Sequence, residues 1–286
     1  MDGALYQVQR GPYTRSVSAT DLRIYERCPA RWYLERKLRL PPDLDAEVYG
    51  EEADRGRAIH HWLRVAHARS RACSEDDLPD VSLRSHQDIA FEDLDDATYA
   101  TIRPFLLHHV QQCPLANSVD VVRLESPLYG WDVTADTIVV SSPDALYIRD
   151  SNLVVRETKT TNAELPPDAD VARDGFEGIV YWLLALLDGG WTTRHGATEG
   201  VVELEVLTPK GAEVFTYRTS DETLMLIAEA RVANRVGQWH YDTEWQARPG
   251  AHCSACPMAI WCPEAASGYT PPSPAAMRPT QSGVSY

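Results

Sequence analysis

The chain has 286 residues, of which 44% are hydrophobic and 24% are charged. This composition excludes a fibrous or mostly disordered protein. The chain carries 27 basic and 42 acidic residues, which gives a net charge of −15. Taken alone, this charge argues against DNA or RNA as a partner, because binding to phosphate backbones depends on lysine and arginine. Net charge does not describe how the charges are distributed, so the objection stays open at this stage.

No segment of the sequence predicts a membrane span. The longest apolar run, residues 179–187, is far shorter than the roughly 18 residues that a spanning helix needs. The N-terminus also lacks the basic region and apolar stretch of a secretory signal, so we expect a cytoplasmic protein. In that reducing compartment, the six cysteines are not expected to form disulfides.

The N-terminal part of the sequence predicts helices. Residues 1–17 show no regular pattern and are expected to form an irregular arm. Apolar residues at helical spacing then predict helices over residues 18–41, 52–71 and 95–112. The segment between the last two contains nine acidic residues from 75 to 96, which favours a solvated polar loop.

The second half of the sequence alternates between strand and helix patterns. Strands are predicted at residues 121–124, 137–140, 145–148, 153–157, 201–207 and 213–217. Helices are predicted at residues 174–187, ending at a pair of glycines, and at residues 221–240. These patterns favour an α/β protein.

A cysteine-rich segment near the C-terminus is the strongest local signal. It follows the pattern C-x2-C-x5-C over residues 253–262, and three thiolates at such short spacing suit a soft metal or an iron-sulfur cluster. Cys28, which precedes a proline, is the candidate fourth ligand. Spacing alone does not separate an iron-sulfur cluster from zinc, and a chance group of buried cysteines is the third interpretation. Cys73 and Cys113 have no cysteine neighbours and are interpreted as ordinary small residues.

A second group of candidate residues lies in the β-rich region. Pro143-Asp144 is followed by Glu157-Thr158-Lys159, and in a strand Glu157 and Lys159 point to the same face while Thr158 points to the other. Converging carboxylates bind Mg²⁺ or Mn²⁺, and a nearby ammonium can orient an attacking water. An exposed hairpin with acidic and basic side chains would give the same pattern.

Two helical motifs add weaker signals. His60 lies beside the apolar stripe formed by Ile59 and Leu63, where a histidine could equally be an ordinary core or surface residue. Glu177 and Tyr181 are one turn apart and can face the same surface. Neither motif predicts a function by itself.

Together, these motifs resemble the RecB family of PD-(D/E)XK nucleases, in the branch that carries an iron-sulfur cluster. That branch includes the CRISPR-associated adaptation exonucleases and the AddB-type nuclease domains. The match runs in order from residue 18 to residue 263. Its elements are Ser18-x3-Leu22-x2-Tyr25-x2-Cys28-Pro29-x2-Trp32-Tyr33, Gly56-x3-His60-x2-Leu63, Pro143-Asp144, Glu157-Thr158-Lys159 and Cys253-x2-Cys256-x5-Cys262.

The resemblance implies a restriction-endonuclease-like α/β core, with a central mixed β-sheet flanked by helices and the N- and C-terminal segments joined by a metal cluster. The nuclease domain would cover residues 18–263. It would consist of a helical part (18–118), a catalytic β-rich core (119–240) and the cysteine segment (241–263), followed by a disordered tail at 264–286.

The resemblance also implies roles for individual residues. His60, Asp144 and Glu157, with the backbone carbonyl of Thr158, would bind Mg²⁺ or Mn²⁺, and Lys159 would be the catalytic lysine, together with Asp144 and Glu157. The 4Fe-4S cluster would be bound by Cys28, Cys253, Cys256 and Cys262.

Tyr181 and Glu177 would contact the substrate. The chain departs from the family at two positions: Glu177 stands where glutamine is usual, and Ser142 where glycine is commoner. These departures affect the expected substrate contacts and leave the core chemistry intact.

The function that this resemblance implies is that of a Mg²⁺- or Mn²⁺-dependent deoxyribonuclease, expected to be an exonuclease that leaves a 5′-phosphate and a 3′-hydroxyl. It would act on single-stranded DNA or duplex ends, in CRISPR spacer adaptation or in DNA end processing and repair. CRISPR integrase proteins or a helicase are the partners that the resemblance suggests. The chain has no Walker A motif, so any ATP-driven unwinding would have to come from a partner. The alternatives are a non-catalytic module that binds DNA ends or docks such a partner, and a zinc-stapled scaffold.

The distribution of charge revises the first objection to DNA. Residues 10–39 contain eight basic and three acidic side chains, and five more arginines follow by residue 71. We therefore expect DNA contact in this basic N-terminal third, which contains Cys28 and His60. The acidic total then predicts weak, salt-sensitive binding by the isolated chain and a basic partner that delivers the substrate.

Overall fold

The computed structural model describes residues 15–43, 51–78, 96–117, 119–132, 134–176 and 178–265. The chain divides into two compact units. The first is made of residues 1–23 and 51–243, and the second of residues 24–50 and 244–286. Most of the predicted N-terminal arm, most of the acidic loop, and all but the first two residues of the predicted C-terminal tail lie outside the described residues.

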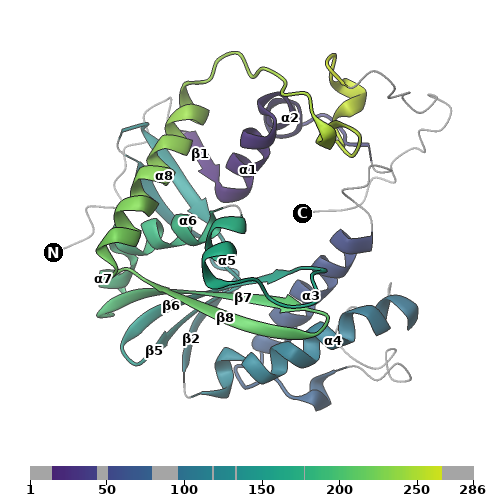
Figure 1. The fold of residues 1–286 in the computed structure, drawn as a ribbon. Coiled ribbons are helices and arrows are strands. Elements are labelled where there is room, and N and C mark those ends of the chain that lie inside the picture. Colours follow the sequence, from purple (N-terminus) through teal and green to yellow (C-terminus); the bar gives the residue numbers. More distant parts are fainter. Residues whose placement is uncertain are drawn as a thin grey trace. The chain divides into compact units, whose positions relative to one another are not determined.

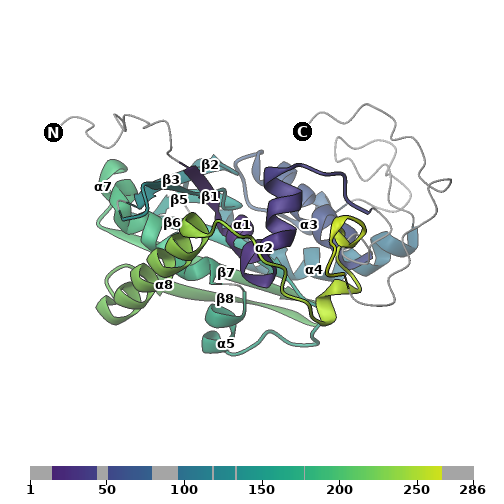
Figure 2. The same ribbon diagram turned by 90° about the horizontal axis from the view of Figure 1, so that it is seen from above.

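A five-stranded mixed sheet forms the centre of the first unit, which confirms the predicted fold class. Its order is β2 (Asp120–Leu124), β5 (Ala145–Arg149), β6 (Asn152–Thr160), β7 (Glu199–Thr208) and β8 (Gly211–Arg218). The β6 and β7 strands are parallel, and the other neighbours are antiparallel. Nearly all of β7 is buried, as expected for a strand with neighbours on both sides. Figure 2 shows β7 and β8 from above as one long hairpin.

A second sheet of three strands corrects the sequence prediction twice. Its order is β1 (Arg15–Ser18), β4 (Thr137–Ser141) and β3 (Leu128–Asp132). Residues 15–17 were predicted to be irregular, but they form a strand because they pair in parallel with β4, a contact that local sequence does not reveal. The β3 strand was not predicted because Gly130 interrupts its pattern. A Cβ at Gly130 would lie 3.2 Å from Leu186 and 3.3 Å from Val139, so close packing favours glycine.

Helices cover both faces of the five-stranded sheet (Figure 1). On one face lie α3 (Glu51–His67) and α4 (Asp96–Gln112), and on the other α6 (Ile179–Leu186). The α8 helix (Glu222–Tyr241) packs on α6, and the shorter α5 (Ala169–Gly175) and α7 (Thr192–Arg194) flank α6 in sequence. An apolar core fills the space between α3, α4 and the sheet, and includes Trp62, Phe105 and Leu207.

The predicted helix over residues 174–187 is divided into two. The α5 helix ends at Gly175, and α6 begins after Gly178, whose φ of +69° is in the left-handed region that favours glycine. A Cβ at Gly178 would also lie 2.9 Å from Nη1 of Arg235. The helix predicted over residues 52–71 ends early, at His67.

The second unit combines two segments that are far apart in the sequence. The predicted helix over residues 18–41 is interrupted at Cys28, where α1 (Ala19–Arg27) ends and α2 (Pro29–Trp32) begins, since proline lacks the N–H that would continue the helix. A π-helical segment, Tyr33–Lys37, follows α2. Trp245, from the C-terminal segment, stacks on Trp32 with ring centroids 4.8 Å apart. The two segments thus share one aromatic core.

Candidate functional site

Three segments of the first unit bring the predicted catalytic residues together. His60 comes from α3, Asp144 immediately precedes β5, and Glu157, Thr158 and Lys159 lie on β6. The Nδ1 atom of His60 is 2.9 Å from Oδ1 of Asp144, and the backbone N–H of Thr158 donates a 2.7 Å hydrogen bond to Oδ2 of Asp144. Lys159 donates a 2.5 Å hydrogen bond to Glu157. We name these five residues the carboxylate site.

Side chains along β6 alternate between the two faces of the strand, and this alternation decides which of them point into the carboxylate site. Glu157 and Lys159 share one face, whereas Thr158 points to the opposite face and donates its hydroxyl to Glu205 over 2.9 Å. Glu157 is only 8% exposed. The alternative of a solvated hairpin with exposed charges is therefore wrong for this strand.

His60 and Asp144 stabilise each other's charged forms. Burial alone would lower the pKa of His60, but the hydrogen bond and the negative charge of Asp144 raise it above its ordinary value. Burial would likewise raise the pKa of Asp144, but the contacts with His60 and with the N–H of Thr158 lower it. Asp144 is therefore a carboxylate at neutral pH, and its two oxygens are held in fixed directions.

Glu157 and Lys159 form the other charged pair. Burial raises the pKa of Glu157, and Asp144 adds to that rise, so the opposing effect of Lys159 does not fully compensate. Burial would lower the pKa of Lys159, but Glu157 and Asp144 raise it, so this side chain is an ammonium at neutral pH. Two carboxylates that repel each other in a buried site are a suitable environment for a divalent cation.

The comparison with family models identifies the fold around this site. A model described as the PD-(D/E)XK nuclease superfamily matches residues 16–263. The chain belongs to this superfamily. Its members are metal-dependent nucleases, and a PD-(D/E)XK nuclease acts on DNA.

This PD-(D/E)XK nuclease is also similar to a solved structure titled "Crystal structure of SSO0001", with 17% sequence identity, coverage of 91% of each chain and a TM-score of 0.40. No curated protein matches the sequence significantly. In the described part of the chain, no helix is both long and apolar enough to cross a membrane.

In the second unit of this nuclease, the four predicted cluster cysteines line one pocket. The pocket also contains Arg31, Arg248 and His252; its cysteines are Cys28, Cys253, Cys256 and Cys262. The backbone N–H of Arg248 donates to the sulfur of Cys28 over 3.5 Å, and that of Gly250 donates to Cys253 over 3.4 Å. The structure therefore brings Cys28 to the C-terminal motif, although 225 positions separate it from Cys253.

The structure describes only one of the two residues predicted to contact the substrate. Glu177 lies outside the described residues. Tyr181 is buried, its hydroxyl donates to Asp174 and accepts a 2.9 Å hydrogen bond from Arg173, and Arg231 lies over its ring at 4.4 Å. Tyr181 therefore holds two arginines in place, so any DNA contact at this point would come from the arginines.

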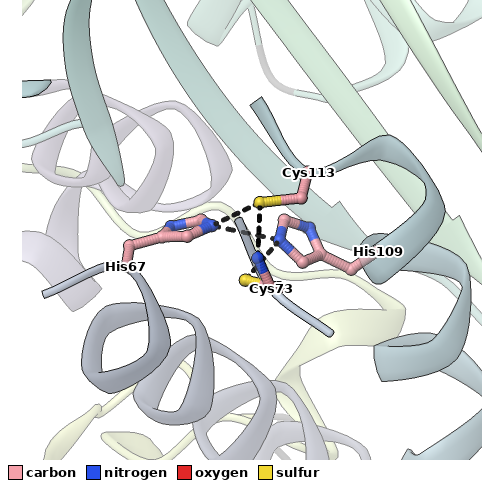
Figure 3. Close-up of side chains that lie close together, drawn as sticks. All are labelled: His67, Cys73, His109 and Cys113. Atoms are coloured by element: carbon pink, nitrogen blue, oxygen red, sulfur yellow. Dashed lines mark hydrogen bonds between the residues drawn. The ribbon is translucent and has the colours of Figure 1, made fainter. Parts of the chain in front are cut away.

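Sequence reasoning missed a group of side chains in the first unit whose atoms could hold a metal ion. Cys73 and Cys113 were interpreted as ordinary small residues, but their sulfurs converge with ring nitrogens of His67 and His109 (Figure 3). All four ligand atoms lie within 4.8 Å of one another. The available signal was the pairing of each cysteine with a histidine shortly before it, as H-x5-C and H-x3-C. We name these four residues the His/Cys group.

Proposed function

We propose that this protein is a Mg²⁺- or Mn²⁺-dependent deoxyribonuclease of the RecB-like iron-sulfur branch, acting as an exonuclease. The observation that carries the proposal is the convergence of His60, Asp144, Glu157 and Lys159 from three separate segments. Imidazole and carboxylate donors beside a lysine ammonium form a suitable set for metal-assisted hydrolysis of a phosphodiester.

The donor set suits a hard divalent cation. Asp144 and Glu157 supply carboxylate oxygens, and each lies close enough to His60 and Lys159 to be influenced by them electrostatically. His60 and the backbone carbonyl of Thr158 complete the proposed ligands. Mg²⁺ or Mn²⁺ bound there would polarise the phosphodiester and lower the pKa of a bound water.

In this proposal Lys159 positions the nucleophile. Its ammonium is held beside Glu157, on the same face of β6, and can donate a hydrogen bond to the attacking water or to a phosphate oxygen. Water oxygen then bonds to phosphorus, the bond from phosphorus to the 3′-oxygen breaks, and a proton from the water passes to that oxygen. The products are a 5′-phosphate and a 3′-hydroxyl.

The four-cysteine pocket is proposed to bind a 4Fe-4S cluster with a structural role. Two backbone N–H groups donate to cysteine sulfurs, and such donors stabilise the negative charge of a thiolate-bound cluster. Arg31 and Arg248 add positive charge around the same pocket. Bound through Cys28 and the C-terminal motif, the cluster would join the two segments of the second unit, and hydrolysis would need none of its electrons.

The proposed substrate is DNA with an accessible end, single-stranded or duplex, and the proposed settings are CRISPR adaptation and DNA end processing. Some arginines of the basic N-terminal third have structural partners. Arg69 and Arg71 both pair with the buried carboxylate of Asp77. These ion pairs reduce the positive charge available for binding phosphates. They support the proposal that a partner, such as an integrase or a helicase, delivers the DNA.

The test uses anaerobically purified protein, Mn²⁺, and DNA labelled at one end, both single-stranded and duplex. We expect a ladder of shortened products that identifies the direction of digestion. Lys159→Ala should abolish cleavage while preserving the circular dichroism spectrum. Lys210→Ala is the matched control, because Lys210 is an exposed lysine that pairs with the exposed Glu164. Cleavage that Lys159→Ala leaves undiminished would contradict the proposal, and no cleavage by the wild type would favour the non-catalytic alternative.

A further inference from the structure

The His/Cys group lies in the core between α3 and α4. It is on the opposite side of β6 from the carboxylates of the carboxylate site. His67 is in the last turn of α3, and Cys73 follows on the loop after this helix. His109 is in the last turn of α4, and Cys113 comes directly after α4, four positions later. Figure 3 shows the four side chains pointing inward to one place.

The spacing of the ligand atoms matches that around a single tetrahedral ion. Bonds of about 2.3 Å to sulfur and about 2.0–2.1 Å to nitrogen place two nitrogens about 3.3 Å apart and a sulfur about 3.5 Å from a nitrogen. In the structure, the Nε2 atoms of His67 and His109 are 3.1 Å apart. The sulfur of Cys73 is 3.8 Å from Nε2 of His109, and that of Cys113 is 3.7 Å from Nε2 of His67.

The surroundings of His109 favour its role as a metal ligand. Its Nδ1 lies 2.9 Å from both carboxylate oxygens of Glu205, and both residues are completely buried. A ring N–H donated to a carboxylate fixes the tautomer and leaves Nε2 free to bind a metal. Carboxylate, imidazole and metal in series are a common arrangement at zinc centres.

Burial and charge also favour a metal at the His/Cys group. All four residues are buried, with exposed fractions of 7% or less. Cys73 and Cys113 belong to the apolar core between α3, α4 and the sheet. Two thiolates and two neutral imidazoles balance the charge of a divalent ion, so the ion and its four ligands would together be neutral, and the adjacent Glu205 carboxylate is faced by Arg156. Two sulfur and two nitrogen ligands are the set that structural zinc uses.

We propose that His67, Cys73, His109 and Cys113 bind one structural Zn²⁺, independently of the four-cysteine pocket. The ion would hold the C-terminal ends of α3 and α4 together. Through His109 and Glu205 it would also be connected to β7, and Glu205 accepts the hydroxyl of Thr158 on β6. This inference does not rest on the proposed nuclease activity.

The first test measures metal in the full chain. Purified protein should contain about one zinc per chain, and zinc-edge X-ray absorption should show two sulfurs at about 2.3 Å and two nitrogens at about 2.0–2.1 Å. Cys113→Ser should lose this zinc, whereas Cys262→Ser, in the other cysteine set, should keep it. If the wild type neither contains nor takes up zinc, or if its zinc has four sulfur ligands and persists in Cys113→Ser, the proposal is wrong.

A second pair of variants retains all four ligands and so does not depend on the folding of Cys113→Ser. Glu205→Gln should lower zinc affinity by about 10–100-fold, measured by competition with a chelator, because the carboxylate partner of His109 is removed. Glu203→Gln is the matched control: Glu203 is buried two positions earlier on β7 and, like Glu205, pairs with Arg156, but its other contacts are with Tyr147 and Arg149. Equal affinities in the two variants would contradict the proposed role of Glu205.

Discussion

Thr158 donates its hydroxyl to Glu205 over 2.9 Å while its backbone N–H donates to Asp144 over 2.7 Å. One residue therefore contacts the carboxylate site on one side of β6 and, on the other, the carboxylate that holds His109. The position of Thr158 between Glu157 and Lys159 makes this connection a consequence of strand geometry.

The first prediction concerns this connection. Thr158→Val removes the hydroxyl and keeps the backbone N–H, so the free energy of unfolding should fall by about 1–2 kcal/mol because Glu205 loses a buried donor. Cleavage should fall less than about tenfold, which corresponds to about 1.4 kcal/mol in the barrier. Urea unfolding and cleavage assays measure the two effects. Thr216→Val, at an exposed position on β8, is the control and should change neither. A loss of cleavage as large as that of Lys159→Ala would show that the hydroxyl itself acts in the reaction.

The second prediction concerns Asp144. Asp144→Asn preserves the shape of the side chain but removes the charge from a proposed metal ligand, so calorimetry should show weaker Mn²⁺ binding. Mutation of a residue that only hydrogen-bonds to a metal ligand already lowers metal affinity or activity by about 10–100-fold. Cleavage should therefore fall by more than about 100-fold when a proposed ligand itself is changed. Asp188→Asn, at an exposed position, should have wild-type affinity and activity. Unchanged Mn²⁺ affinity in Asp144→Asn would exclude Asp144 as a ligand.

The third prediction concerns stability at low pH. Glu203 is buried and accepts hydrogen bonds from Tyr147, Arg149 and Arg156; burial would raise its pKa, but Arg156 and these donors lower it. A lowered pKa in the folded state stabilises the protein above the unfolded pKa of about 4.3, and this contribution is lost as the pH falls through the lower folded value.

Glu203→Gln should therefore reduce the free energy of unfolding by about 3 kcal/mol at pH 7, because it removes the closer of the two carboxylates that pair with the buried Arg156. The difference from wild type should shrink below about pH 4, where the wild-type carboxylate becomes protonated. Urea unfolding at several pH values measures both effects, and Glu213→Gln, at an exposed position on β8, is the control. A difference that is constant with pH would contradict the lowered pKa.

The fourth prediction concerns the four-cysteine pocket. Anaerobically purified protein should contain about four irons per chain and absorb visible light, as expected for a cluster bound by four cysteines. Cys262→Ser should lose most of the iron and the absorbance, while Ser254→Ala, in the same segment, should keep both. Zinc in place of iron, with four sulfur ligands, would support the scaffold alternative for this pocket.

Some of the site could be predicted because its pattern is local. In β6 the two-residue period places Glu157 and Lys159 on one face and Thr158 on the other, whatever surrounds the strand. The short spacing of Cys253, Cys256 and Cys262 likewise indicates a metal site without knowledge of the fold. The sequence offered Cys28 only as a candidate fourth ligand and His60 only as one helical histidine, and the family resemblance assigned each of them to a site.

The tertiary structure alone decided which distant residues meet. Cys73 and Cys113 have no neighbouring cysteine in the sequence, and they meet His67 and His109 only because α3 and α4 pack together on the sheet. The β1 strand forms for the same kind of reason, since it depends on pairing with β4, more than 100 positions away. The sequence by itself thus determined the fold class and the motifs, because periodicity and short spacing are local properties. The His/Cys group required the packed fold, because its four residues come from elements whose contact no local pattern encodes.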